Sequence, residues 1–354
     1  MGGVGDVHGD LKKTVTSLEL AGVLEMQGGD RPVWTGGDAT VVQMGDVLDR
    51  GDCELRVLLL LRRLDEQARR VGGAVWMLNG NHESLNVMGD FRYVTPGAFW
   101  ESATLAGVTE EEAAADPRSV LRARWELFRP GGRVALELAA NPTVLVVNDI
   151  VFAHGGLLPH HLGYGLERIN AEVAHWMAGV PYEQGASGPP PRPPAASAGT
   201  RRPRPPFEAF GDATSIMWNR TYGREREAPH ERRVVRDQLM ATLRALRARA
   251  LVVGHTPQAR GLNADCEGRV WRVDVGMSAG VMDADPAVLE FSVADADGVV
   301  TATARRAPPR WHSMREPGDP YHAAERAWKL TPLDQGKAEP RRAAEAAVGA
   351  AGAP

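Results

Sequence analysis

Aspartate, asparagine and histidine recur in five short, glycine-bearing clusters along the chain. The clusters are GDVHGD (5–10), GDVLDRG (45–51), NGNHE (79–83), AHGG (153–156) and GHT (254–256). Six of their side chains are candidate metal ligands: Asp6, His8, Asp46, Asn81, His154 and His255. The set combines imidazole with oxygen donors and contains no thiolate. It therefore suits manganese, iron or zinc better than a softer metal or a structural zinc site.

Six ligands are more than one catalytic metal with an open coordination position can use, so a carboxylate shared by two metals is expected. Two metals roughly 4 Å apart can hold a hydroxide between them and bind phosphoryl oxygens during in-line attack. Taken singly, each cluster also fits ordinary turn material or a structural histidine. Because all five follow apolar runs, we favour a dimetal site that hydrolyses phosphoesters.

The apolar runs are the elements that must position these clusters. They alternate with helical patterns up to about residue 256, which indicates an α/β fold. Loops at the carboxyl ends of strands meet in one crevice in such folds, so distant clusters can share one site. Helices are expected at 11–22, 53–70 and 231–249, the first capped by Asp10.

Two hairpins and two further strands complete the expected elements. One hairpin spans 31–44 and turns at Gly36 and Gly37, and the other spans 143–153 and turns at Asn148 and Asp149. Strands are expected at 75–78 and 251–253, and NGNHE is expected to be the loop after the first of them.

Composition restricts the class of protein. The 354 residues include 41 Lys and Arg against 45 Asp and Glu, so a general basic field for nucleic acid or membranes is excluded. Cys53 and Cys266 allow at most one disulfide and exclude a cysteine-built zinc site. The longest apolar run, 57–61, is too short to span a bilayer. The sequence therefore favours a soluble protein with no transmembrane segment.

The first cluster lies at the very start of the chain. A central strand of about five residues should lead into Asp6, but only Gly2 to Val4 can form it. We therefore expect either a truncated strand or a natural start upstream of Met1. The protein is expected to be cytoplasmic by default, or plastidic if an upstream targeting segment is missing.

Two segments do not follow the strand and helix alternation. Residues 185–206 are rich in Pro, Ala and Arg and are expected to form a disordered surface insertion. A polyproline motif for a partner domain is the alternative interpretation of that insertion. Residues 313–354 are expected to be a mostly disordered tail, which leaves 1–312 as the catalytic domain.

In this order, the five clusters resemble the signature of metallophosphoesterases of the phosphoprotein phosphatase superfamily. Longer strings resemble the Shewanella-like protein phosphatases: WTGGDATVVQMGDVLDRGD, NGNHESLNVMGDFRYV, MWNRTYG and WRVDVGMSAG. The similarity spans roughly residues 4–295. It implies a calcineurin-like α/β fold, with a central sandwich of two mixed β-sheets flanked by helices. The helical stretch 100–129 has no counterpart in the minimal fold and is a candidate cap over the cleft.

The resemblance also implies a role for each matched residue. Asp6 and His8 would hold the first metal, with Asp46 as the bridge. The second metal would be held by Asn81, His154 and His255. His82 would be the general acid that protonates the leaving oxygen, oriented by Asp49. The residues placed at the substrate phosphate are Arg50, Arg220 and Asn81.

The activity implied is hydrolysis of phosphomonoesters by a metal-bridging hydroxide, with phosphoproteins carrying phosphoserine, phosphothreonine or phosphotyrosine as substrates. Two alternatives remain open. A symmetrical dinucleoside-tetraphosphate hydrolase shares the same metal motifs. A non-catalytic phosphate-binding scaffold could keep the motifs without turnover.

Four residues near the motifs have no assigned chemistry. Arg92 and Tyr93 are expected to pack behind the site. His160 and His161 match no motif spacing and are expected in a surface loop.

Overall fold

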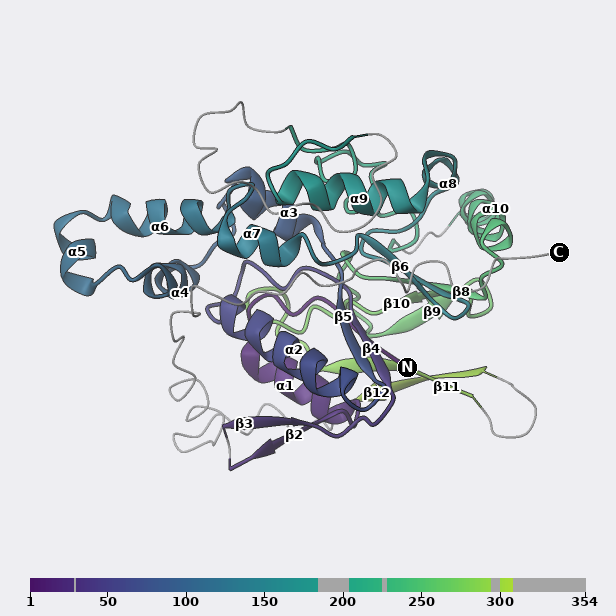
Figure 1. Ribbon diagram of the computed structural model, residues 1–354. Helices are drawn as coiled ribbons and strands as arrows, with labels where there is room; N and C mark the ends of the chain where they lie inside the picture. Colours follow the sequence, from purple (N-terminus) through teal and green to yellow (C-terminus); the bar gives the residue numbers. More distant parts are fainter. Residues whose placement is uncertain (29, 184–203, 225–227, 294–299, 308–354) are drawn as a thin grey trace.

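Two five-stranded mixed sheets form the centre of the protein (Figure 1). The computed structural model describes residues 1–28, 30–183, 204–224, 228–293 and 300–307. The first sheet has the order β12 (Val300–Arg306), β11 (Ala287–Val293), β1 (Gly2–Val4), β4 (Thr40–Gln43) and β5 (Ala74–Met77). The second has the order β6 (Val144–Val147), β7 (Ile150–Ala153), β8 (Ala250–Val253), β10 (Val270–Arg272) and β9 (Asn263–Asp265). A separate ribbon pairs β2 (Leu24–Gln27) with β3 (Arg31–Trp34).

The two sheets pack on each other through β1. Gly3 of β1 faces the second sheet, because a Cβ at this position would lie in ordinary van der Waals contact with Val252 of β8 and Phe152 of β7. Buried aliphatic side chains from both sheets fill the interface, as expected for strands that carry apolar residues on both faces. The predicted sandwich of two mixed sheets is therefore confirmed.

Ten helices flank the sheets in the described part of the chain. They are α1 (Leu11–Leu20), α2 (Glu54–Arg69), α3 (Asn81–Met88), α4 (Pro96–Ala106), α5 (Glu110–Ala115), α6 (Arg118–Phe128), α7 (Arg133–Leu138), α8 (Pro159–Tyr164), α9 (Leu166–Met177) and α10 (Pro229–Ala245). The predicted helices correspond to α1, α2 and α10. Asp10 caps α1 as expected, because its side chain accepts a hydrogen bond from the backbone N–H of Lys13 at 3.0 Å.

The parallel strands explain why the five clusters converge. β1, β4 and β5 run parallel in the first sheet, and β7, β8 and β10 run parallel in the second. Each cluster follows one of these strands, so all of them leave the sandwich at the same edge. The sheet topology thereby creates the common site that the sequence pattern predicts.

The predicted hairpin at 31–44 is wrong, and the predicted loop at NGNHE is only partly correct. Residues 31–44 do not form a hairpin, because β3 pairs with β2 while β4 lies between β1 and β5 in the first sheet. Alternating apolar residues and glycines in the sequence identify strands and turns. They do not identify which strands pair, because the burial of β4 in the core decides its partners. NGNHE is not wholly a loop, because Asn81 begins α3 and the next two residues form its first turn. The predicted hairpin at Asn148 and Asp149 is confirmed by the pairing of β6 with β7.

The two histidines of α8 separate into different environments. His161 is fully buried, accepts a hydrogen bond from the backbone N–H of Leu158 at 2.9 Å, and lies 3.4 Å from Glu208. His160 is exposed. The expected surface loop is therefore wrong, since the short helix turns one imidazole into the core.

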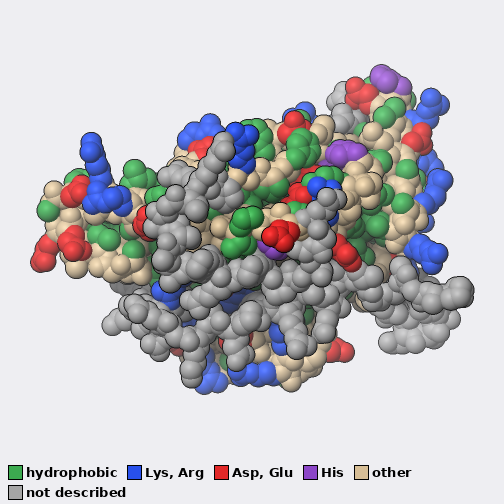
Figure 2. Space-filling view, turned by 45° about the horizontal axis from the view of Figure 1, so that its top comes forward, with side chains coloured by type: hydrophobic (Ala, Val, Ile, Leu, Met, Phe, Trp, Pro, Cys, Tyr) green, Lys and Arg blue, Asp and Glu red, His purple; other side chains and the backbone are tan. Residues whose placement is uncertain are grey.

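Helices α4, α5 and α6 form an arm that projects from one side of the molecule (Figure 1). We call residues 96–128 the arm. Its outer surface carries both acidic and basic side chains (Figure 2). The arm contacts α2 through α4 and α3 through α6. The predicted helical character of 100–129 is confirmed, and a role as a cap over bound substrate stays a prediction.

Two predicted segments fall mostly or wholly on residues that the structure does not describe. Most of the Pro-rich insertion 185–206, and all of the tail 313–354, lie outside the described residues. Among the residues that are described, no helix has both the length and the apolar composition that a membrane crossing requires.

Candidate metal centre and active site

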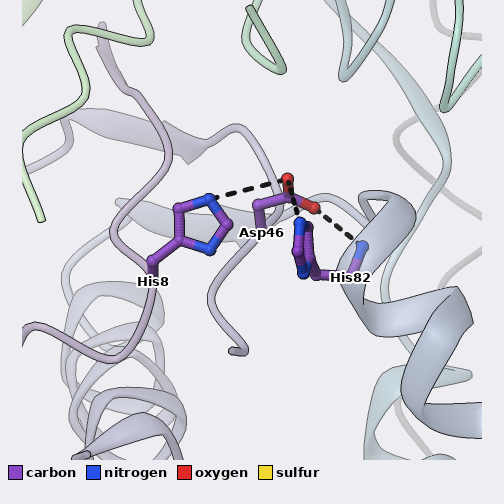
Figure 3. A group of neighbouring side chains, drawn as sticks. All are labelled: His8, Asp46 and His82. Carbon is purple, nitrogen blue, oxygen red and sulfur yellow. Dashed lines mark hydrogen bonds and ion pairs between the residues drawn. The ribbon is translucent and has the colours of Figure 1, made fainter. Parts of the chain in front are cut away.

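Asp46 lies at the centre of the converging clusters. Two groups of three side chains have potential ligand atoms within 4.8 Å of one another, and both groups contain Asp46. One group adds His8 and His82, whose rings point toward the Asp46 carboxylate (Figure 3). The other adds His154 and His255. A carboxylate common to two groups is the arrangement that a shared metal ligand requires.

Backbone carbonyls fix the orientation of three of these four histidine rings. His8 and His154 use Nδ1, which lies 2.9 Å from the Leu48 oxygen and 2.8 Å from the Met44 oxygen respectively. His255 instead uses Nε2, 3.1 Å from the oxygen of Trp218. A ring nitrogen that donates to a carbonyl leaves the other nitrogen with a lone pair for a metal.

Burial favours the neutral form of two of these rings. It lowers the pKa of His8 to about 4, although the charge of Asp46 acts in the opposite direction. Burial and the neighbouring His154 hold the pKa of His255 well below its usual value. Neutral imidazole is the form that binds metal ions, so both rings are prepared as ligands at neutral pH.

Asp6 is a buried carboxylate with one oxygen unused. Its Oδ2 accepts a hydrogen bond from the backbone N–H of His255 at 3.0 Å, while its buried Oδ1 has no hydrogen-bond partner. Burial, followed by the charges of Asp274 and Asp46, raises the pKa of Asp6 well above its usual value. A bound cation would satisfy the orphaned oxygen and offset the repulsion, so the donor set fits metal ions.

Asn81 begins α3 beside these ligands. It is buried, and its Oδ1 lies 3.0 Å from Nε2 of His154. The structure thus places all six predicted ligands in one cluster, although Asp6 and Asn81 lie outside the two groups that share Asp46. The assignment of all six residues as ligands stays a prediction.

His82 and Asp49 form a tight pair next to Asp46. The distance from His82 Nδ1 to Asp49 Oδ2 is 2.6 Å, and Nε2 lies 3.9 Å from Asp46 Oδ2. Burial alone would lower the pKa of His82, but the charge of Asp46 and the hydrogen bond to Asp49 outweigh it and raise the pKa. A protonated imidazole held by a carboxylate can serve as a general acid.

The two predicted phosphate-binding arginines lie near the cluster. The Cζ atom of Arg50 lies 4.9 Å from the ring centroid of Tyr93, and the Tyr93 ring lies 5.1 Å from the His82 ring at an interplanar angle of 60°. Burial lowers the pKa of Arg220, while the charges of Asp46, Asp274 and Asp6 act to raise it. The guanidinium of Arg220 therefore experiences the field of the buried carboxylates.

Left-handed backbone conformations gather at this site. The non-glycine residues with positive φ include His8 (43°), Asp46 (52°), Asp49 (68°), Arg50 (65°) and His255 (65°). Such conformations are costly for residues with a Cβ and persist where the surroundings hold them. Their occurrence at five of the predicted site residues indicates a preorganised site.

Sequence reasoning missed two acidic residues here. Glu83 accepts hydrogen bonds from the backbone N–H groups of Gly80, Asp46, Val47 and Leu48 and so shapes the Asp46 loop. Burial and the charge of Asp46 raise the pKa of Glu83 to about 7. Burial raises the pKa of Asp274 to about 6. Glu83 lies inside the NGNHE cluster, and Asp274 follows β10. These two positions are the signals in the sequence that could have identified them as site residues.

The family model for calcineurin-like phosphoesterases matches residues 2–279 of this chain. The chain belongs to the calcineurin-like phosphoesterase family. Metallophosphoesterases of this family use a dinuclear metal centre, and the His and Asp groups around Asp46 are able to bind metal. The observed sandwich of two mixed sheets is the fold of this family.

Individual relatives place this phosphoesterase in the Shewanella-like branch. Shewanella-like protein phosphatase 2 of Arabidopsis thaliana is 36% identical over 315 residues, covering 81% of this chain and 74% of the plant protein. Shewanella-like protein phosphatase 1 of Plasmodium berghei is 25% identical over 281 residues, covering 78% of this chain and 66% of that protein. The predicted resemblance to this branch is confirmed.

A solved structure shares the fold. The cold-active protein-tyrosine phosphatase of a psychrophilic Shewanella has a TM-score of 0.56 and 21% sequence identity, over 87% of this chain and 80% of that chain. At this identity the similarity supports the fold of the phosphoesterase and does not by itself indicate a substrate.

Gly254 offers a test of how tightly the ligands are packed. A Cβ at Gly254 would overlap Asp6 Oδ1 and displace a carboxylate that is also anchored to the His255 backbone. We expect Gly254→Ala to lower the free energy of unfolding by about 1–3 kcal/mol, as overpacking of cores does, and to weaken manganese binding.

Urea unfolding and manganese titration of the Gly254→Ala protein check this expectation. Gly163→Ala is the matched control, because a Cβ at Gly163 meets no atom within 4 Å. Equal stability and equal manganese affinity in Gly254→Ala and the control would show that Asp6 is not held at this position.

Proposed function

We propose that this chain is a dimetal phosphatase that hydrolyses phosphomonoesters of phosphoproteins, with His82 as the general acid. The observation that carries the proposal is the position of Asp46, common to two groups of ligands and next to the His82–Asp49 pair. Family membership supports a metal-dependent phosphoesterase. The names of the relatives as protein phosphatases support the phosphoprotein substrate.

The proposed ligand roles are those that the resemblance implies. Asp6 and His8 would hold one metal, Asp46 would be common to both, and the remaining ligands would be Asn81, His154 and His255. The donor set suits manganese, iron or zinc. When bound, two such ions supply positive charge at the transferring phosphoryl group and lower the pKa of bound water.

The protein's own residues orient the substrate and move the proton. Arg50, Arg220 and Asn81 bind the phosphoryl oxygens, a role that suits the planar guanidinium of the two arginines. His82 donates a proton from Nε2 to the leaving oxygen, because its Nδ1 is occupied by Asp49. The charge of Asp46 and the hydrogen bond to Asp49 favour the protonated ring, and Asp49 holds the ring in its orientation before the bond breaks.

A substrate panel tests the proposed function. Purified protein with added manganese is assayed by phosphate release from phosphoserine, phosphothreonine and phosphotyrosine peptides and from diadenosine tetraphosphate. We expect turnover of at least one phosphopeptide and slower turnover of the dinucleotide. Preferential cleavage of the dinucleotide would identify a dinucleoside-tetraphosphate hydrolase. Metal binding without turnover of any substrate would identify a scaffold.

A further inference from the structure

A buried arginine from the arm lies behind the His82–Asp49 pair. Arg124, in α6, is 0% exposed and is surrounded by aromatic rings, with its Cζ atom 4.4 Å from the ring centroid of Phe128. Its Nη1 also donates to Ser102 Oγ of α4 at 3.0 Å. A guanidinium removed from water is costly unless anions and acceptors surround it. The partners of its remaining polar contacts therefore show which groups compensate the buried charge.

Two connections lead from Arg124 to Asp49. In the first, Nη1 forms an ion pair with Glu54, and Glu54 Oε2 accepts the backbone N–H of Asp49 at 2.8 Å. In the second, Nε and Nη2 donate to Asn86 Oδ1 at 3.1 and 2.7 Å. This turns the Asn86 amide so that Nδ2 donates to Asp49 Oδ1 at 2.9 Å.

Together the two connections orient the Asp49 carboxylate. One holds its backbone, which has a strained φ of 68°, and the other holds Oδ1. Because a carboxylate is planar, holding these points directs Oδ2 at Nδ1 of His82, 2.6 Å away. Arg124 Nη2 itself lies 3.9 Å from Asp49 Oδ1, so its charge also acts on the pair.

We infer that Arg124 is a positioning residue for the general acid, through which the arm determines how accurately His82 meets the leaving oxygen. This inference rests on the proposed role of His82. It assigns the arm a function in catalysis that does not depend on covering the substrate. A purely structural Arg124 would instead contribute equally to every reaction of the folded enzyme.

The leaving group distinguishes these two roles. Phenyl phosphate has a poor leaving group that needs a proton, whereas 2,4-dinitrophenyl phosphate has a good one that does not. We expect Arg124→Met and Arg124→Lys to lower kcat for phenyl phosphate by about 10- to 100-fold, the usual cost of a misplaced catalytic group. Turnover of 2,4-dinitrophenyl phosphate should change little. In a His82→Asn background, Arg124→Met should add little further loss.

Arg122→Met is the matched control, because Arg122 lies on the same helix and pairs with Asp116 on the surface. Thermal melting and manganese content are measured for each variant. If Arg124→Met does not fold, the ratio of kcat for phenyl phosphate to kcat for 2,4-dinitrophenyl phosphate in Arg124→Lys distinguishes the two roles. Equal losses on both substrates in a folded, metal-loaded variant would overturn the inference. Failure of the unsubstituted protein to hydrolyse either substrate would instead overturn the proposed function.

Discussion

Asp46→Asn is expected to reduce phosphatase turnover by about 10³-fold or more, because several charge-dependent contributions to the transition state are lost together. Asp46 is the carboxylate common to both groups of ligands, and an amide oxygen is a weaker, uncharged ligand. The same variant should lose the rise in melting temperature that manganese gives to the native protein, since a ligand stabilises only the state that binds it. Phosphate release from p-nitrophenyl phosphate and melting curves with and without manganese measure both effects.

Asp38→Asn provides the control for Asp46→Asn, because Asp38 is an exposed carboxylate that follows β3. It should retain both turnover and the manganese-dependent melting shift. Turnover close to that of the native protein in Asp46→Asn, with metal still bound, would show that the centre does not depend on a shared carboxylate. Chelation of the native protein should reproduce the loss of turnover seen in Asp46→Asn.

His82→Asn is expected to lower kcat for phenyl phosphate by about 10²- to 10⁴-fold, the usual contribution of a positioned general acid. The loss for 2,4-dinitrophenyl phosphate should be much smaller, since that leaving group departs without a proton. Manganese content should stay at the native level. Steady-state kinetics on the two esters, together with metal analysis, provide the three measurements.

The His82 experiment also separates two roles that the geometry allows. His82 is grouped with His8 and Asp46 as a potential metal ligand, whereas its hydrogen bond to Asp49 favours a role as the general acid. If His82 were a ligand, His82→Asn would lose manganese and slow both esters equally. His160→Asn is the control, because this exposed imidazole lies in α8, outside the proposed ligands.

The positions of the candidate ligands were predictable because each follows an apolar run. A run of β-branched and aliphatic residues ending in Gly, Asp or His is recognisable without any knowledge of its partners. The predicted strands that precede Asp46, Asn81, His154 and His255 all occur in the sandwich. Helices α1, α2 and α10 were predictable for the same reason, since their apolar period is a local signal, and in α1 so is the cap at Asp10.

Strand pairing was less predictable. The sequence around Gly36 and Gly37 has the pattern of a hairpin, yet β4 pairs in parallel with β1 and β5. Every partner offers similar backbone hydrogen bonds, so burial of the whole sheet decides the pairing. His161 is a similar case, because only the packing of α8 against Glu208 makes its imidazole a buried group.

By itself, the sequence determined which residue types are available for chemistry. It also determined the order in which the strands that carry them follow one another along the chain. Tertiary structure alone decided that Glu83 holds the loop around Asp46, and that Arg124 reaches Asp49 through Asn86 and Glu54. The physical reason is that these contacts join residues far apart in the chain. Their strength comes from burial, which removes competing water and makes each unpaired charge costly.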